Sequence, residues 1–187
     1  MLKRMVFVVM LGVALTTTAV FAQHPRGKTG IGIVGQYGGN WDGGGHGFNH
    51  LALSLKLSSI PIYWGVNLNI FNDDWLGFGI TGDKYFIDQA LVPDIGLGWY
   101  LGVGGYGSFT LYTGNAYNAM WLGAGIRVPI GLSFVIPSTP VEIFLDIAPS
   151  IGLGVGFGDY YGSGAGQHKP IWLDGGWGGD LGIRFWF

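Results

Sequence analysis

The amino-acid sequence predicts an all-β protein, an eight-stranded antiparallel up-and-down transmembrane β-barrel that follows an N-terminal signal peptide. Three observations predict this fold. Hydrophobicity alternates with a period of two in segment after segment, 37 of the 187 residues are glycine, and charged residues make up only 11% against 16% aromatic. Alternation of period two is typical of strands with two different faces. Because soluble proteins average about 25% charged residues, we expect something other than water to cover the outer surface.

The first 22 residues are predicted to be a secretory signal peptide. Lys3 and Arg4 precede an apolar run, and the exit at Val20-Phe21-Ala22 ends on a small residue. A basic start, an apolar stretch and a small-residue exit are typical of a signal that is removed on export. We therefore expect a signal peptide at 1–22 and one outer-membrane β-barrel domain at 23–187.

An uncleaved membrane helix is the alternative interpretation of this segment, but three threonines at 16–18 interrupt its apolar run. After residue 22 no apolar run approaches the roughly 20 residues that a membrane-spanning helix needs. The sequence has no cysteine, which excludes a disulfide framework and a lipid anchor at the cleavage site. The net charge of −2 argues against a nucleic-acid partner.

Eight strands can be traced from the alternation. The clearest is 122–136, where every even position is apolar and the odd positions are mostly glycine or polar, and 141–157 repeats the pattern in the opposite parity. An even number of strands lets a sheet close without leaving an edge in lipid. The predicted strands, of which the first is the least regular, are 29–37, 48–57, 60–70, 75–86, 94–105, 119–136, 141–157 and 176–187.

The connections are predicted to alternate between periplasmic turns and outer loops, as in bacterial barrels. Asn72–Asp74 is an exception, because it should be an outer loop and is short. Pro149 lacks an amide hydrogen, so we expect it at a bulge or at the rim of the barrel. The predicted turns are Ser58–Ser59, Gln89–Pro93 and Pro137–Pro140. The predicted glycine-rich outer loops are 38–47, 106–118 and 158–175.

The face that glycines and charges share is predicted to line the lumen. Eight strands enclose an interior that side chains just fill, so glycine relieves crowding there. Buried charges must pair or meet water, and we expect a salt-bridged, hydrated plug that fixes the register, with Asp146 and Arg184 pairing across neighbouring strands. Acid–base catalysis by these carboxylates is the less favoured alternative. The predicted lumen charge network comprises Lys56, Arg127, Glu142, Asp146, Asp180 and Arg184.

The opposite face carries aromatic residues that fit the interfacial girdles of a membrane barrel. The alternative is a soluble lipocalin-like barrel, which would need the face with Arg127 and Asp146 to lie in water. The predicted girdle residues are Trp64, Trp99, Phe134, Phe157, Trp177 and Phe185.

No cofactor site is predicted. Gly30, Gly32 and Gly35 spell the G-x-G-x-x-G dinucleotide-binding fingerprint. That motif requires a preceding strand, a following helix and an acidic residue further on. Here it lies inside an early strand with no helix after it.

No metal site and no catalytic residue are predicted either. Asp42, His46, His50 and His168 are the candidate metal ligands, but they show no supporting second shell. An outer-membrane hydrolase would need a nucleophile with a histidine partner. Ser163 and His168 are close in sequence, but no third member of a triad is evident.

Three stretches in the C-terminal third carry a resemblance to a known family: RVPIGLS at 127–133, VEIFLDIAP at 141–149 and LGIRFWF at 181–187. They resemble an uncharacterised family of small outer-membrane barrels found in spirochaetes. The whole chain is similar in plan to the eight-stranded OmpA, OmpX and OmpW barrels. Such families end in an aromatic residue that the outer-membrane assembly machinery recognises, and Phe187 occupies that place.

The resemblance implies a fold and a location in the bacterial outer membrane, and no reaction. We expect a non-enzymatic outer-membrane barrel with a structural or surface-interaction role. The alternative is a narrow pore or conduit for small or hydrophobic solutes. The expected partners are outer-membrane lipid, the assembly machinery and an extracellular ligand of the loops, while the oligomeric state stays open.

Overall fold

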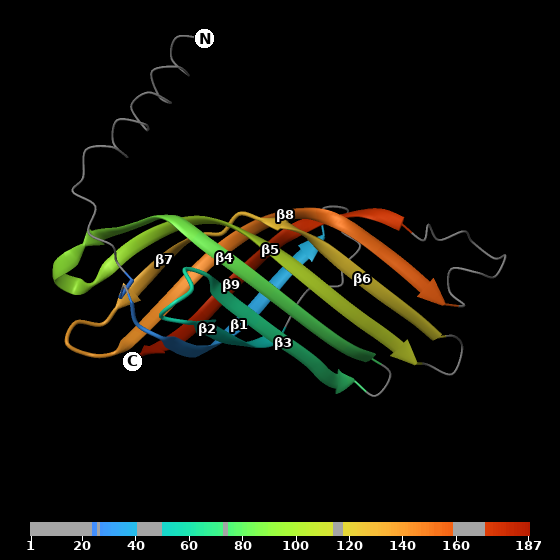
Figure 1. The fold of residues 1–187 in the computed structure, drawn as a ribbon, viewed down its shortest axis with the longest axis horizontal. Coiled ribbons are helices and arrows are strands. Elements are labelled where there is room, and N and C mark those ends of the chain that lie inside the picture. Colours follow the sequence, from blue (N-terminus) through green and yellow to red (C-terminus); the bar gives the residue numbers. More distant parts are fainter. Residues whose placement is uncertain (1–23, 26, 41–49, 73–74, 114–117, 159–170) are drawn as a thin grey trace, which may run out of the picture.

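The computed structural model describes residues 24–25, 27–40, 50–72, 75–113, 118–158 and 171–187. Its strands form one antiparallel sheet that closes on itself, with β9 beside β1 and β4 beside β5 (Figure 1). The predicted all-β antiparallel barrel is confirmed. The strands are β1 (Gly30–Asn40), β2 (His50–Lys56), β3 (Tyr63–Asn72), β4 (Trp75–Val92), β5 (Leu97–Thr113), β6 (Asn118–Arg127), β7 (Ile130–Val135), β8 (Val141–Gly158) and β9 (Ile171–Trp186).

β6 and β7 together form one strand of the barrel wall. Both pair with β5 on one side and with β8 on the other, and their register is the same before and after the break. The ladder is interrupted at Pro129, which has no amide hydrogen to donate. The predicted strand 119–136 is therefore confirmed as one wall strand, and the described residues form eight wall strands, as predicted.

The prediction that Pro149 marks a bulge or the rim is wrong. Pro149 lies inside β8 and pairs with Trp177 of β9 without a shift of register. Its carbonyl oxygen accepts a hydrogen bond of 3.0 Å from the amide of Val128. The residue therefore keeps the acceptor half of its ladder position and loses only the donor half.

β4 is longer than predicted, and the predicted turn at Gln89–Pro93 is wrong. The strand continues to Val92, and the chain reverses in a 3₁₀ turn at Pro93–Ile95 that ends on Gly96 with φ 74°. A register shift at Phe86, between Tyr85 and Ile87, reverses the parity of the strand. The alternation in the sequence stops at this bulge, which explains the early end of the predicted strand.

Most other boundaries differ because glycine-rich stretches predicted as loops continue the strands. Residues 38–40 belong to β1, 106–113 to β5 and 171–175 to β9. In the opposite sense, β3 begins at 63 rather than 60 and β5 at 97 rather than 94. The first strand, predicted as the least regular, pairs with both neighbours without a register shift. The rest of the predicted outer loops lies outside the described residues, as does the signal peptide at 1–22.

The connections β2–β3, β4–β5 and β7–β8 and the chain end lie at one end of the barrel, which we call the turn end; the opposite end is the loop end (Figure 1). The ring closes at the turn end, where the amide of Phe187 donates to Thr29 O at 2.8 Å and the amide of Thr29 donates to Phe187 O at 3.2 Å. Asn72 pairs with Trp75, while the other two residues of the short connection predicted at 72–74 lie outside the described residues. The turn-end connections are 57–62, 93–96 and 136–140.

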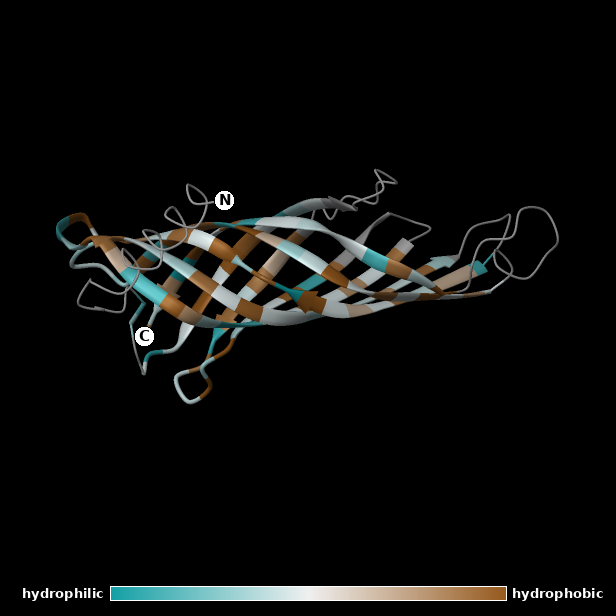
Figure 2. Ribbon diagram, turned by 90° about the horizontal axis from the view of Figure 1, so that it is seen from above, coloured by the Kyte–Doolittle hydropathy of each residue, from teal (hydrophilic) through white to brown (hydrophobic). Residues whose placement is uncertain are grey.

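The two faces of the barrel wall differ in the way that the alternation predicts. Large apolar side chains are exposed on the outer face, including Leu145 in β8 and Leu181 in β9, while Glu142 and Arg184 on the same strands are buried. Figure 2 shows hydrophobic residues recurring along the strands between white and teal ones. In the described part of the chain, no helix is both long and apolar enough to span a membrane.

Candidate functional site: the charged lumen

Polar side chains fill the lumen at two levels, and a cavity forms a third level. A turn-end layer is built around Glu142 and Arg184, a middle layer around Arg127, and a cavity lies beyond the middle layer toward the loop end. The side chains of the two layers come from the inward phases of several wall strands. The levels are therefore fixed by strand register.

Arg127 is the centre of the middle layer. Its Nε lies 3.2 Å from Asp83 Oδ1, and its Nη2 lies 3.0 Å from Asp180 Oδ2 and 3.7 Å from Asp146 Oδ1. Four wall strands are joined through this one guanidinium. Because three carboxylates face one cation in a buried site, the pairing with Arg127 is essential to hold them there.

Glu142 and Arg184 form the turn-end layer. They are register partners on β8 and β9, with Arg184 Nη1 2.8 Å from Glu142 Oε2. The same oxygen accepts a hydrogen bond from Trp186 Nε1 at 2.9 Å, and Arg184 Nη2 donates to Ser54 Oγ at 2.9 Å. Glu142 Oε2, Arg184 Nη1 and Arg184 Nη2 thus each have a hydrogen-bond partner, as buried polar atoms require.

His24 lies inside the lumen although it precedes the first strand. It is 3% exposed. Its Nδ1 lies 2.9 Å from Asp88 Oδ1 and its Nε2 lies 2.8 Å from Glu142 Oε1. Both ring nitrogens face carboxylates, so the doubly protonated ring can donate to both.

Three tyrosines are stacked beside His24. The ring centroids of Tyr63 and Tyr85 are 4.1 Å apart and those of Tyr85 and Tyr100 are 4.3 Å apart, with interplanar angles of 16° and 21°. They come from β3, β4 and β5. Tyr100 also donates a hydrogen bond of 2.8 Å to Asp146 Oδ2, which links this stack to the middle layer.

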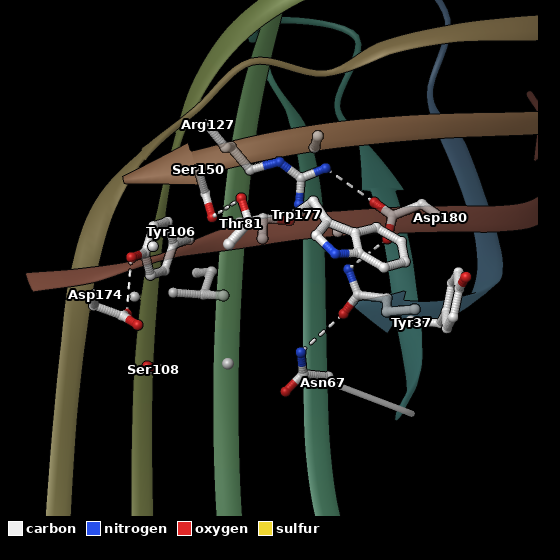
Figure 3. Close-up of a pocket in the computed structure, with 18 residues that line it drawn as sticks. Tyr37, Asn67, Thr81, Tyr106, Ser108, Arg127, Ser150, Asp174, Trp177 and Asp180 are labelled. Carbon is white, nitrogen blue, oxygen red and sulfur yellow. Dashed lines mark hydrogen bonds and ion pairs between the residues drawn. The ribbon is translucent and has the colours of Figure 1, made fainter. Parts of the chain in front are cut away.

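The cavity beyond Arg127 has a volume of about 90 Å³, which is enough for several water molecules. Figure 3 shows Arg127 and Asp180 joined along one side of it, and Tyr106 with Asp174 along another. The Tyr106 hydroxyl donates to Asp174 Oδ2 at 2.9 Å. The lining combines apolar surface with the charged side chains of Arg127, Asp174 and Asp180, and these charged groups can hold water in the cavity.

Glycines on the inward phase make room for the charged groups. A Cβ at Gly131 would lie 2.6 Å from both Asp146 Cβ and Tyr100 Cζ, and one at Gly104 would overlap Asp83. These distances are shorter than a carbon–carbon contact of 3.5–4.0 Å allows. The glycine content of the sequence is thus partly a requirement of the lumen.

The structure brings five of the six predicted network residues into ion pairs, but the expected pairing of Asp146 with Arg184 is wrong. Arg184 pairs with Glu142, its direct register partner, and Asp146 faces Arg127. Lys56 is buried, and its Nζ donates to Leu57 O at 2.6 Å and lies 5.7 Å from the centroid of the Tyr63 ring. It forms no ion pair with any of the described residues. The wall strands are tilted relative to the barrel axis. The height of a residue along that axis therefore depends on the register between strands and not only on how far the residue lies from a turn.

Several lumen residues were not predicted. Asp83 and Tyr85 continue the inward phase of residues 77, 79 and 81, and extending that alternation would have found them. Asp88 is hidden by the bulge that reverses the parity of β4. His24 lies in no alternating segment, so no sequence pattern indicates it.

The other residues that the sequence offered as cofactor, metal or catalytic candidates do not form a site among the described residues. Gly30, Gly32 and Gly35 lie in β1, as predicted, and no α-helix follows them in the described residues. The candidates Asp42, His46, Ser163 and His168 lie outside the described residues, and only the backbone of His50 is described, at the start of β2.

The charge state of His24 predicts how stability depends on pH. Burial alone lowers the pKa of His24, but the Glu142 and Asp88 carboxylates more than offset this and raise it from 6.5 to about 9. A raised pKa adds stability that is fully present below pH 6.5 and is lost as the pH rises through about 9; a difference of this size corresponds to about 3 kcal/mol. Urea unfolding midpoints of the refolded protein should fall between pH 6.5 and 9.5. In His24→Ala this fall should be largely absent, and an equal fall in that variant would contradict the assignment.

A closed antiparallel ring with an apolar outer face and an ion-paired lumen defines the chain as a small β-barrel of the inside-polar kind. The chain belongs to the family described as "Protein of unknown function (DUF3996)", whose sequence model matches residues 46–165. A comparison with curated proteins gives no match. Among solved structures, the crystal structure of Neisserial surface protein A (NspA) is similar, with a TM-score of 0.38, 11% identity, and coverage of 86% of this chain and 96% of that one.

The match to the family ends before the stretch at 181–187, on which the resemblance to spirochaetal barrels partly depends. That narrower resemblance stays a prediction.

Proposed function

We propose that this protein is a bacterial outer-membrane β-barrel with a structural or surface-interaction role and no catalytic activity. The observation that carries the proposal is the inverted polarity of the wall, with aliphatic side chains exposed outside and ion pairs buried inside. Leu145 and Leu181 are 54% and 60% exposed, whereas Glu142 is 0% exposed. In water the exposed aliphatic outer face would be unfavourable, whereas lipid around the wall removes that cost and leaves the charges paired inside.

The strand lengths support a role at the cell surface. β8 has 18 residues and β9 has 16, whereas a membrane-spanning strand needs about 9–11. At about 3.3 Å per residue and a tilt of about 45°, an 18-residue strand rises roughly 40 Å along the barrel axis. The apolar band of such barrels is about 25 Å tall. The remaining length extends the wall beyond the bilayer, where the loop end meets external molecules.

The filled lumen favours a structural role over a conduit. Side chains of the turn-end and middle layers occupy the bore, and the cavity beyond them has Arg127 and Asp180 in its lining. A conduit for hydrophobic solutes would require an apolar path, and these layers supply charges instead. A refolded sample in planar bilayers is expected to show no steady conductance.

The remaining parts of the proposal concern export and assembly. We infer that residues 1–22 are removed on export, that the turn end faces the periplasm, and that Phe187 serves as the assembly signal. Phe187 is 73% exposed on the outside of the turn end. Its ring is thereby available to a partner while its backbone pairs with Thr29.

Membrane insertion can be tested with a charge on the outer face. Leu145→Arg should destabilise the barrel in lipid vesicles by about 2–4 kcal/mol, because it places a cation near the bilayer midplane. On the surface of a soluble protein the same change would cost within about 0.5 kcal/mol. The measurement is urea unfolding in vesicles, followed by the difference in gel mobility between boiled and unboiled samples.

Ser59→Arg is the matched control, because Ser59 is exposed in a turn outside the strands. It should behave like the parent protein. Equal stability of Leu145→Arg and Ser59→Arg, or recovery of the native protein in the soluble periplasmic fraction, would overturn the proposal.

A further inference from the structure

The turn end of the lumen holds a side chain that does not belong to the barrel wall. His24 is six residues before β1, and its ring is enclosed by wall residues. Its centroid is 5.3 Å from that of Tyr63, 5.5 Å from those of Tyr85 and Tyr100, and 6.2 Å from that of Trp186. The wall therefore forms an aromatic box around it.

Two carboxylates complete this box from opposite sides. Asp88 of β4 lies at 2.9 Å from one ring nitrogen and Glu142 of β8 at 2.8 Å from the other. Glu142 is also paired with Arg184, so the box holds two acidic groups and one basic group before His24 is added. A single positive charge on the His24 ring therefore brings the net charge of these four groups to zero.

We propose that the turn end of the lumen is a binding site for an imidazolium group, and that His24 is its resident ligand, supplied by the chain itself. The geometry selects this chemical class. Two acceptors on opposite edges require a flat ring with two N–H donors, whereas an ammonium ion presents its donors around one atom. Aromatic rings on several sides favour a cation over a neutral ring.

The ligand is attached in a way that allows it to leave. Among the described contacts, His24 is held only by these side chains, and its amide lies 3.3 Å from Asp88 Oδ1. The ladder begins later, at the mutual hydrogen bonds of Thr29 and Phe187. None of the described residues before Thr29 takes part in a strand pairing, so withdrawal of His24 leaves the ladder intact and opens the box at the turn end for an imidazole-bearing molecule.

Chemical rescue tests this proposal. The refolded His24→Ala variant should have a lower thermal unfolding midpoint than the parent at pH 6.5, and added imidazole should raise that midpoint in a saturable manner. The parent protein should not respond, because its site is filled. Methylammonium at equal ionic strength should have no effect on the variant. A second change, His24→Ala with Asp88→Asn, should weaken the imidazole affinity about tenfold, since one charge-assisted hydrogen bond is lost.

Lys28→Ala is the matched control, because it removes an exposed cation from the same segment. It should neither lose stability nor respond to imidazole. If His24→Ala folds and imidazole has no effect, or if methylammonium stabilises it equally, the proposal is wrong. If the variant refolds only with imidazole present, that recovery is itself the expected rescue.

A measurement on the parent protein covers the case in which the variant never folds. Nitrogen-15 NMR at pH 7 should show both ring nitrogens of His24 protonated, with slowly exchanging hydrogens. A ring that is neutral or exchanges rapidly would overturn the proposal. Neither experiment depends on membrane insertion, so each can fail while the proposed function stands.

Discussion

Arg127→Met is expected to destabilise the barrel by about 3–5 kcal/mol, the usual effect of removing one partner from a buried ionic network. The substitution leaves the carboxylates of Asp83, Asp146 and Asp180 facing one another, without the cation that lies 3.0–3.7 Å from each of them. The measurement is the urea midpoint of the refolded barrel at pH 7, read from its heat-dependent gel mobility.

The control for charge removal is Lys84→Met, because Lys84 lies on β4 like Asp83 but is exposed on the outer face. It should unfold near the midpoint of the parent protein. Adding Asp83→Asn and Asp146→Asn to Arg127→Met should recover part of the lost stability, since the uncompensated charges are then gone. Equal midpoints for Arg127→Met and Lys84→Met would rule out the middle layer as a stabilising network.

Gly32→Ala is the second change for which we expect a large effect. A Cβ at Gly32 would overlap the backbone oxygen of Ile183 and lie 2.7 Å from Arg184 Cα, and backbone atoms at a paired strand cannot move aside cheaply. Overpacking of this kind costs about 1–3 kcal/mol, and more where the backbone must shift. Denaturant midpoints in detergent should show this loss.

Gly35→Ala is the matched control on the same strand. Its Cβ would meet only the backbone oxygen of Leu181, at 3.7 Å, an ordinary contact. The change should be neutral or stabilising by up to about 1 kcal/mol, because alanine restricts the unfolded chain. If both substitutions had the same effect, the close approach of the β9 backbone would not explain the glycine at position 32.

The alternation in the sequence was sufficient to predict the barrel, because each face of a wall strand meets one environment along its whole length. The inward positions of Arg127, Glu142 and Arg184 follow from that phase alone. Strand ends could not be predicted as well, since glycine is typical of loops and also of a crowded lumen. Thus 106–113 and 171–175 were predicted as loops and are strands.

The ion-pair partners of the charged residues could not be predicted from an alternation of period two. Phase determines the face on which a residue lies, whereas pairing depends on the register between strands, and one bulge near Phe86 changes both for Asp88. His24 reaches the lumen by a contact across 118 positions of sequence to Glu142. Nothing local to His24 encodes that contact.

The tyrosine stack gives the barrel an optical signature of its lumen. Three phenol rings held at 4.1 Å and 4.3 Å in a fixed chiral arrangement absorb as a coupled set. Near-ultraviolet circular dichroism would follow that set, while far-ultraviolet dichroism follows the backbone ladder. A state in which the wall persists while its interior loosens keeps the second signal and loses the first. Interior order and wall order can therefore be monitored separately in one sample, without an added label.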